Sequence, residues 1–112
     1  MVNVQFFYNE QGEIIGFEVE GHAEYAPYGE DIVCAALSVL AQTTVLGLQY
    51  HLPEPPDFKI SDGFVRCFLP ERLKQRDQEN AKIIVETMRL GMETIQKSYP
   101  RNVKVFKRRW TA

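Results

Sequence analysis

Residues Ile32 to Tyr50 form a run of 19 residues without a charged side chain, and Asp31 stands directly before it. The run is close to the length that crosses a bilayer, but it includes polar and small residues, and no basic cluster flanks it. We therefore expect the central helix of a soluble protein, without membrane contact, buried nearly all round, capped by Asp31 and ending near Gln49. The polar or small members are Ser38, Gln42, Thr43, Thr44, Gly47 and Gln49.

The rest of the chain predicts strands and a second helix around this central helix. Alternating apolar side chains indicate strands, and Asp62-Gly63 between two of them is a strong hairpin signal. Apolar residues three, four and seven apart indicate an amphipathic helix in the second half. The order ββαββαβ predicts an α+β fold: a mainly antiparallel sheet of about five strands with both helices on one face. The predicted strands are residues 2–8, 14–20, 58–61, 64–69 and 103–109, and the second helix is residues 77–98.

Length, charge and cysteine content narrow the functional classes. A chain of 112 residues buries one modest core, so we expect a single domain over residues 1–112. Thirteen Lys and Arg against 15 Asp and Glu give a net charge of −2, which argues against nucleic acid as a partner. No signal peptide is predicted, so the two cysteines are expected to be reduced thiols in the cytoplasm. No metal or cofactor is expected, because no Cys/His cluster has zinc spacing and no glycine-rich phosphate loop is present.

Cys34 and His22 are the residues that most readily suggest catalysis. Cys34 would be the third residue of the capped helix, where backbone N–H groups and the helix dipole favour a thiolate and can donate to an oxyanion. The step from His22 to Cys34 is long enough to bring a base beside this nucleophile. Each residue also has an ordinary structural role: Cys34 in the core, His22 at the surface, Asp31 as a cap, and Ser38 as a packed helix serine. The residues alone leave both interpretations open.

The loop over residues 23–30, which joins the two candidate catalytic residues, shows neither strand nor helix periodicity. No run of apolar side chains would pin it to the core, so we expect it to lie near the substrate and to close over a bound peptide. Gly29 is the expected hinge, because glycine reaches backbone angles that other residues avoid. Gly21, Tyr25 and Tyr28 complete the predicted substrate-binding or gating set.

The segment from Gly21 to Ser38 resembles the signature of the ribosomal-processing cysteine proteases, the Prp family. The resemblance extends to the chain length and the order of elements. It implies His22 as base and Cys34 as nucleophile, with Asp31 and Ser38 at supporting positions. It also implies a homodimer that removes an apolar N-terminal leader from the precursor of a large-subunit ribosomal protein, the twenty-seventh in conventional numbering. The matching residues are Gly21-His22-Ala23, Tyr28-Gly29 and Asp31-Ile32-Val33-Cys34-Ala35-Ala36, followed by Ser38.

A basic C-terminal segment supports a different function. Residues 97–109 contain six Lys or Arg and no acid, with Phe106 within the segment and Trp110 just after it. Basic residues interleaved with aromatic ones can hold phosphates and stack bases, so a non-catalytic RNA- or ribosome-binding module is the main alternative. The segment is also typical of an edge strand whose charges discourage pairing. A third alternative is a thiol enzyme that acts on small molecules.

Overall fold

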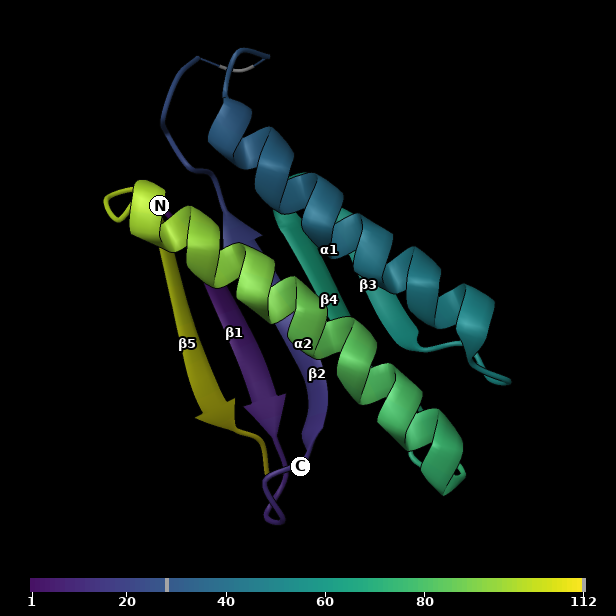
Figure 1. Cartoon of the computed structure of the whole chain (residues 1–112). Helices are drawn as coiled ribbons and strands as arrows, with labels where there is room; N and C mark the ends of the chain where they lie inside the picture. The colour runs from purple at the N-terminus through teal and green to yellow at the C-terminus, as the bar shows by residue number, and fades with distance from the viewer. Residues whose placement is uncertain (28, 112) are drawn as a thin grey trace.

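Five strands and two helices follow one another in the predicted order ββαββαβ within residues 1–27 and 29–111, the part of the chain that the computed structural model describes (Figure 1). Tyr28, one of the predicted substrate contacts, lies outside the described residues. The strands are β1 (Val2–Tyr8), β2 (Ile14–Gly21), β3 (Asp57–Ser61), β4 (Phe64–Phe68) and β5 (Val103–Arg109), and the helices are α1 (Ile32–His51) and α2 (Gln75–Ser98).

The strands form one sheet in the order β3-β4-β2-β1-β5. Every neighbouring pair is antiparallel except β1 and β5, which run parallel. Both helices lie on the same face of the sheet, α1 over the side of β4 and α2 over the side of β1 and β5 (Figure 1). The predicted α+β class, with a mainly antiparallel sheet and both helices on one face, is therefore confirmed.

The core lies between the sheet and the two helices. Strand residues two apart point toward the helices, as Val2, Val4 and Phe6 do in β1, and all three are buried. Each helix presents apolar residues three or four positions apart to this surface, which is the spacing of one helix face. The helix members of the core are Val33, Leu37, Ala41, Val45 and Leu48 of α1, and Ala81, Val85, Met88 and Met92 of α2.

The prediction that the central helix, α1, is buried nearly all round is wrong. On its outer face Val39, Leu46 and Tyr50 are 64%, 63% and 84% exposed. Only 33% of its most apolar stretch is buried, and by length and composition alone the helix could cross a membrane. The reason is the architecture, because a helix that packs on one face of a sheet has a single covered side, whatever residues occupy the other. In the single chain, the outer face of α1 therefore exposes apolar side chains to solvent.

The open face of the sheet is less polar than the alternation in β2 predicts. Alternation places Glu18 on a solvent-facing side, yet Glu18 is 5% exposed. Its carboxylate accepts hydrogen bonds from Arg66 Nε at 2.8 Å and from Gln5 Nε2 at 3.1 Å. The Arg66 guanidinium in turn lies over the rings of Phe68 and Trp110. These neighbours come from other strands and from the C-terminal segment, so the period within β2 cannot reveal the burial of Glu18.

Both helices are longer by two residues than predicted. α1 continues to His51, and α2 begins at Gln75. Lys74, the residue before α2, makes no side-chain cap hydrogen bond, so the sequence carries no start signal there. Instead the Gln78 side-chain amide donates to the carbonyl of Leu73 at 2.9 Å. This bond from the first turn back to the preceding segment is not a pattern that helix periodicity can locate.

Gly21 ends β2 at a position that glycine fills without strain. Its φ is 108°, and a Cβ built there would lie 2.4 Å from the carbonyl oxygen of Met1. The Gly21 N–H donates to the carbonyl of Gly63 at 2.9 Å, which ties the end of β2 to the turn between β3 and β4. The exit of the chain toward His22 therefore depends on a glycine at this position.

We predict that Gly21→Ala lowers the free energy of unfolding more than Gly12→Ala does. Gly12 also has a positive φ, 77°, but a Cβ there would meet no atom within 4 Å, so its cost should be the backbone strain alone, about 1–2 kcal/mol. The collision at Gly21 should add at least about 1 kcal/mol. Urea unfolding of both variants measures the difference, and equal losses would show that the Met1 end simply moves aside.

Candidate active site

His22 and Cys34 line the same cavity, which has a volume of about 670 Å³. Its walls come from the end of β2, the first turns of α1 and the turn between β3 and β4. Asp31 and Ser38, the two predicted supporting residues, line it as well, as do Gly21 and Gly29. The fold thus gathers the predicted nucleophile, base and supporting residues at one place, at the N-terminus of α1.

Asp31 fixes the start of α1 through both oxygens of its carboxylate. Oδ1 accepts from the N–H of Cys34 at 2.9 Å, so Asp31 is the N-cap and Cys34 the third helical residue, as predicted. Oδ2 accepts from the N–H of Tyr25 at 3.0 Å. Desolvation opposes the shift, but backbone hydrogen bonds, those from Cys34 and Tyr25 foremost, hold the pKa of Asp31 below its ordinary value. The carboxylate is therefore the form that the helix start and the loop both require.

The same hydrogen bonds limit what else Asp31 and the helix start can do. Within residues 1–27 and 29–111, no hydrogen bond joins Asp31 to His22, and both carboxylate oxygens already have backbone partners. The N–H of Cys34, a backbone donor on the same residue as the thiol, is occupied by Asp31. An oxyanion at this helix start would have to share that donor or draw on another group.

His22 is exposed and lies against the turn between β3 and β4. A Cβ built on Gly63 would sit 2.8 Å from His22 Nε2 and 3.0 Å from its Cε1. Gly63 has a φ of 68° as well, so it serves both the turn and the imidazole. The sequence identifies Asp62-Gly63 only as a hairpin turn, because nothing local shows that the turn meets His22.

α1 presents a row of polar side chains to the cavity, one turn apart. Cys34, Ser38 and Gln42 all line it, at positions i, i+4 and i+8 of the helix. Gln42 was absent from the predicted site, although its spacing from Cys34 and Ser38 was a usable signal. On the opposite wall, the residues that sequence reasoning missed are Ser61, Asp62, Gly63 and Phe64.

The loop after His22 is held at its beginning. Ala23 is 1% exposed, and its carbonyl accepts from Asn102 Nδ2 at 2.8 Å, so the expectation that nothing pins the loop to the core is wrong at this end. The Tyr25 ring lies edge-on to Tyr99, with 5.3 Å between ring centroids, and Tyr25 does not line the cavity. Gly29 has a φ of 89° with open space around it, which fits the conformational freedom expected there.

Cys67 lies apart from this site. It is fully buried in β4, and burial, with a smaller contribution from the charge of Asp57, raises the pKa of its thiol to about 12. Both cysteines are free, and Cys67 is part of the hydrophobic core. In the described part of the chain, no three His, Cys, Asp or Glu side chains come together in a way that could hold a metal ion.

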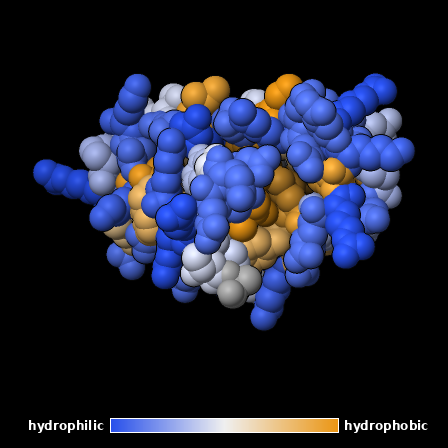
Figure 2. Space-filling view, turned by 90° about the horizontal axis from the view of Figure 1, so that it is seen from below, coloured by the Kyte–Doolittle hydropathy of each residue, from blue (hydrophilic) through white to orange (hydrophobic). Residues whose placement is uncertain are grey.

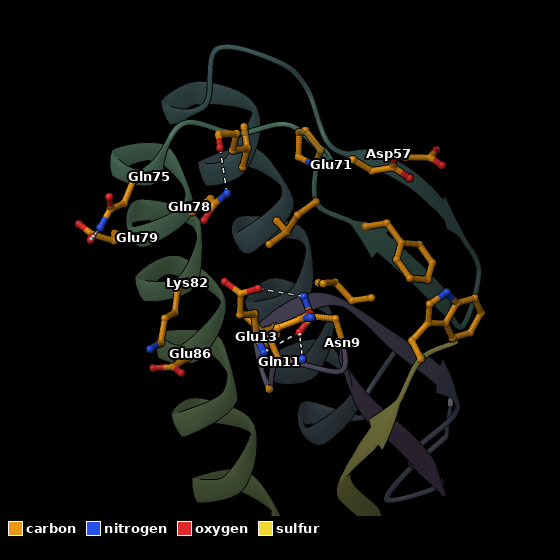
Figure 3. A pocket seen from close by; sticks show the side chains of 18 residues that line it. Asn9, Gln11, Glu13, Asp57, Glu71, Gln75, Gln78, Glu79, Lys82 and Glu86 are labelled. Carbon is orange, nitrogen blue, oxygen red and sulfur yellow. Dashed lines mark hydrogen bonds between the residues drawn. The ribbon is translucent and has the colours of Figure 1, made fainter. Parts of the chain in front are cut away.

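A second cavity, of about 900 Å³, opens at the other end of the molecule, between the β1–β2 turn and the start of α2 (Figure 3). Figure 2, which views this end, shows apolar side chains at the bottom of a hollow with hydrophilic ones around it. The labelled side chains in Figure 3 are mostly carboxylates and amides, such as Glu13, Gln78 and Glu86. Among the described residues that line it there is neither a cysteine nor a histidine, so of the two cavities the smaller one holds the predicted catalytic pair, Cys34 and His22.

The basic C-terminal segment does not form one patch. β5 pairs along its length with β1, so its successive side chains alternate between the two faces of the sheet. Lys104 lies over the Phe106 ring and Arg108 donates to Gln5 on the open face, whereas Lys107 lies over the Tyr8 ring on the helix-covered face. Division of these cations between two faces weakens the case for a single phosphate-binding surface.

The comparisons with known proteins agree with one another. The sequence model of the family described as "Cysteine protease Prp" matches residues 1–104. The ribosomal processing cysteine protease Prp of Staphylococcus aureus is 28% identical over 105 residues, which are 94% of this chain and 97% of that protein. The protein of the same name from Bacillus subtilis is 30% identical over 94 residues, 82% of this chain and 84% of that protein.

Solved structures show the same likeness in three dimensions. The crystal structure of the S. aureus Prp with a covalently linked product peptide has a TM-score of 0.85 and 26% identity, covering 96% of this chain and 100% of that one. The same protein in complex with a substrate peptide has a TM-score of 0.80 and 25% identity, again covering 96% and 100% of the two chains. With Cys34 and His22 lining one cavity, and with the family's sequence model matched over residues 1–104, this protein belongs to the Prp family of ribosomal processing cysteine proteases.

Proposed function

We propose that this cysteine protease removes an apolar N-terminal extension from the precursor of a large-subunit ribosomal protein, the twenty-seventh in conventional numbering, in the cytoplasm. The observation that carries the proposal is the cavity at the N-terminus of α1, because it brings Cys34 and His22 together beside an exposed strand edge. The presence of two free cysteines fits a reducing compartment.

The proposed mechanism uses Cys34 and His22 as a dyad. The Cys34 thiolate attacks the scissile carbonyl while His22 holds the proton as imidazolium. His22 then protonates the leaving amine, which leaves a thioester on Cys34, and water hydrolyses the thioester with His22 as base. Asp31 acts as a positioning residue, because it holds the helix turn that carries Cys34 and the loop that follows His22.

The loop and Ser38 have supporting roles in this proposal. In this loop Pro27, Gly29 and Glu30 are exposed, and Gly29 supplies a backbone conformation that most residues avoid. Closure of this part over bound peptide would exclude bulk water while Cys34 attacks the scissile carbonyl. Ser38, one turn after Cys34, is placed to donate a hydrogen bond to the substrate or to the region of the thiol.

We also propose that the chain acts as a homodimer. The support is the outer face of α1, where Ile32, Val39 and Leu46 recur every seven residues, with Tyr50 one turn further. A seven-residue apolar spacing suits pairing of one helix with another. The face carries no charge, so pairing it with the same face of a second copy would bury no charged side chain.

The first test is cleavage of the precursor. Cys34→Ser should abolish processing, and His22→Ala should slow it by roughly a hundredfold or more, because each removes one member of the dyad. Mass spectrometry of the products from a purified precursor measures both. Cys67→Ser is the matched control: it changes the other cysteine without touching the cavity. Normal cleavage by His22→Ala, with an unchanged melting temperature, would refute the dyad. The binding-module alternative would be favoured if the wild-type protein cleaved nothing but bound RNA, and if Cys34→Ser bound RNA equally well.

Alkylation should distinguish the two thiols in the folded protein. Cys34 lies in an open cavity, whereas Cys67 is fully buried with a pKa of about 12, so at neutral pH almost none of Cys67 is thiolate. Iodoacetamide should therefore modify Cys34 faster by at least about tenfold, as measured by peptide mass spectrometry over time. In urea both should react alike, and similar rates in the native state would contradict the geometry.

The dimer has its own test. Val39→Glu should shift the protein from dimer to monomer in sedimentation equilibrium, because a charge would be buried in the paired face. Ile83→Glu is a closely matched control, since Ile83 on α2 is also 64% exposed but lies outside the proposed face. Equal effects of the two variants, or a monomeric wild type, would refute this interface.

A further inference from the structure

The sheet has two edges, and the backbone hydrogen bonds between β2 and the ends of β4 establish which backbone groups face outward on β3. Leu69 N–H donates to the Ile15 carbonyl, and Gly21 N–H donates to the Gly63 carbonyl. Because the two sites of an antiparallel ladder alternate, the odd-numbered residues of β4 bond to β2 and the even-numbered ones bond to β3. With Lys59 opposite Arg66 in the register, the N–H and C=O groups of Phe58 and Ile60 point away from the sheet.

The edge at β5 is already partly occupied. Val2 N–H donates to the Asn102 carbonyl and Trp110 N–H donates to the Tyr8 carbonyl, so the backbone groups of odd-numbered residues in β5 face outward. One of these, the N–H of Val105, donates to the side-chain carbonyl of Gln96 on α2. This edge therefore has a side chain across its middle and a row of cations along it, both of which discourage strand pairing.

The edge at β3 has no such cover. In the part of the chain that the structure describes, no side chain bonds to the N–H of Phe58 or Ile60, and all five residues of β3 are exposed. An open edge of this kind is a template for another strand. The side chains of Phe58 and Ile60 lie on the helix-covered face, opposite the buried Cys67 and Val65, yet they are 39% and 42% exposed. The edge thus combines free backbone groups with apolar side chains at alternate positions.

This edge leads directly into the catalytic cavity. Ser61, the last residue of β3, lines the cavity together with Cys34, and so does the turn that follows it. The opposite wall is the row of Cys34, Ser38 and Gln42 on α1. A chain lying along the outside of β3 would therefore pass from the Phe58 and Ile60 edge into the space between the turn and Cys34.

We infer that an extended segment of the substrate, next to the scissile bond, pairs with β3 as a sixth strand of the sheet. This inference rests on the proposed function and specifies how that function is carried out: backbone hydrogen bonds to Phe58 and Ile60 hold the peptide, and their side chains contact apolar residues at alternate positions. An apolar leader suits such an edge, and strand pairing fixes the scissile carbonyl relative to Cys34.

The sharpest test replaces one backbone amide at a time by an ester in a peptide that spans the cleavage site of the precursor. Each ester removes an N–H donor, so kcat/KM of the wild-type protein should fall by about tenfold at every second position and little in between. A uniform response along the peptide, or none, overturns strand pairing. If the wild-type protein cleaves the unmodified peptide, that result leaves the proposed function standing; absence of cleavage removes both.

A protein variant provides the reciprocal test. Ile60→Pro removes an N–H donor that faces away from the sheet, so the fold should tolerate proline there as on other edge strands. Because the substrate loses one backbone hydrogen bond, kcat/KM should fall by about tenfold. Ile60→Ala retains the N–H and separates loss of the side chain from loss of the donor, so its fall should be smaller. Lys107→Pro, which removes an outward N–H at the β5 edge, is the matched control and should cleave like the wild type.

Two further measurements keep the interpretation of Ile60→Pro clear. Alkylation of Cys34 does not depend on a bound peptide, so Ile60→Pro should react at the wild-type rate if its cavity is intact. Sedimentation equilibrium should show the same mass as the wild type. A variant that loses dimer mass and retains the wild-type kcat/KM would show that a second copy, and not the substrate, pairs with β3, and the inference would be wrong.

Discussion

The carboxylate of Asp31 holds together the parts of the site that the chain brings in from different directions. One oxygen accepts from Cys34 N–H at the start of α1, and the other accepts from Tyr25 N–H in the loop that follows His22. Backbone donors hold the pKa of Asp31 below its ordinary value. These hydrogen bonds are therefore fully present above the ordinary pKa of aspartate and are lost as the pH falls through the lower folded value. The geometry of Cys34 and of the loop thus depends on one ionised group.

The sheet supplies the second half of the site. The Gly21–Gly63 hydrogen bond places the end of β2 beside the β3–β4 turn, so His22 emerges next to Gly63. α1 crosses the sheet from this point, with its polar row toward the turn and its apolar face toward the core. Both helices cover one face of the sheet only, so the outer side of α1 remains open, and the edge of β3 is open because β3 is the last strand of the sheet. These two open surfaces are the ones on which we base the proposed dimer and the proposed substrate strand.

Much of this fold could be predicted from the sequence, because its signals are local. Alternation in β1 and β2, the Asp62-Gly63 turn and the spacing of apolar residues in α2 each depend on a few neighbouring residues. The order of these elements then restricts the topology to few arrangements. The candidate site could be predicted for the same reason, since the Asp31 cap and Cys34 three residues later form a local motif. Helix boundaries such as the start of α2, which has no capping side chain, could not be predicted from the sequence.

By itself the sequence determined the elements, their order and the chemical types at the helix start, since propensity, capping and turn chemistry act over a few residues. Only the tertiary structure decided which side of α1 is covered, because burial depends on what packs against a helix and not on its composition. It also decided that Glu18 is buried beneath Arg66 and that Gly63 meets His22. Those contacts join residues about 40 or more positions apart, and no pattern within one segment encodes a partner at that distance.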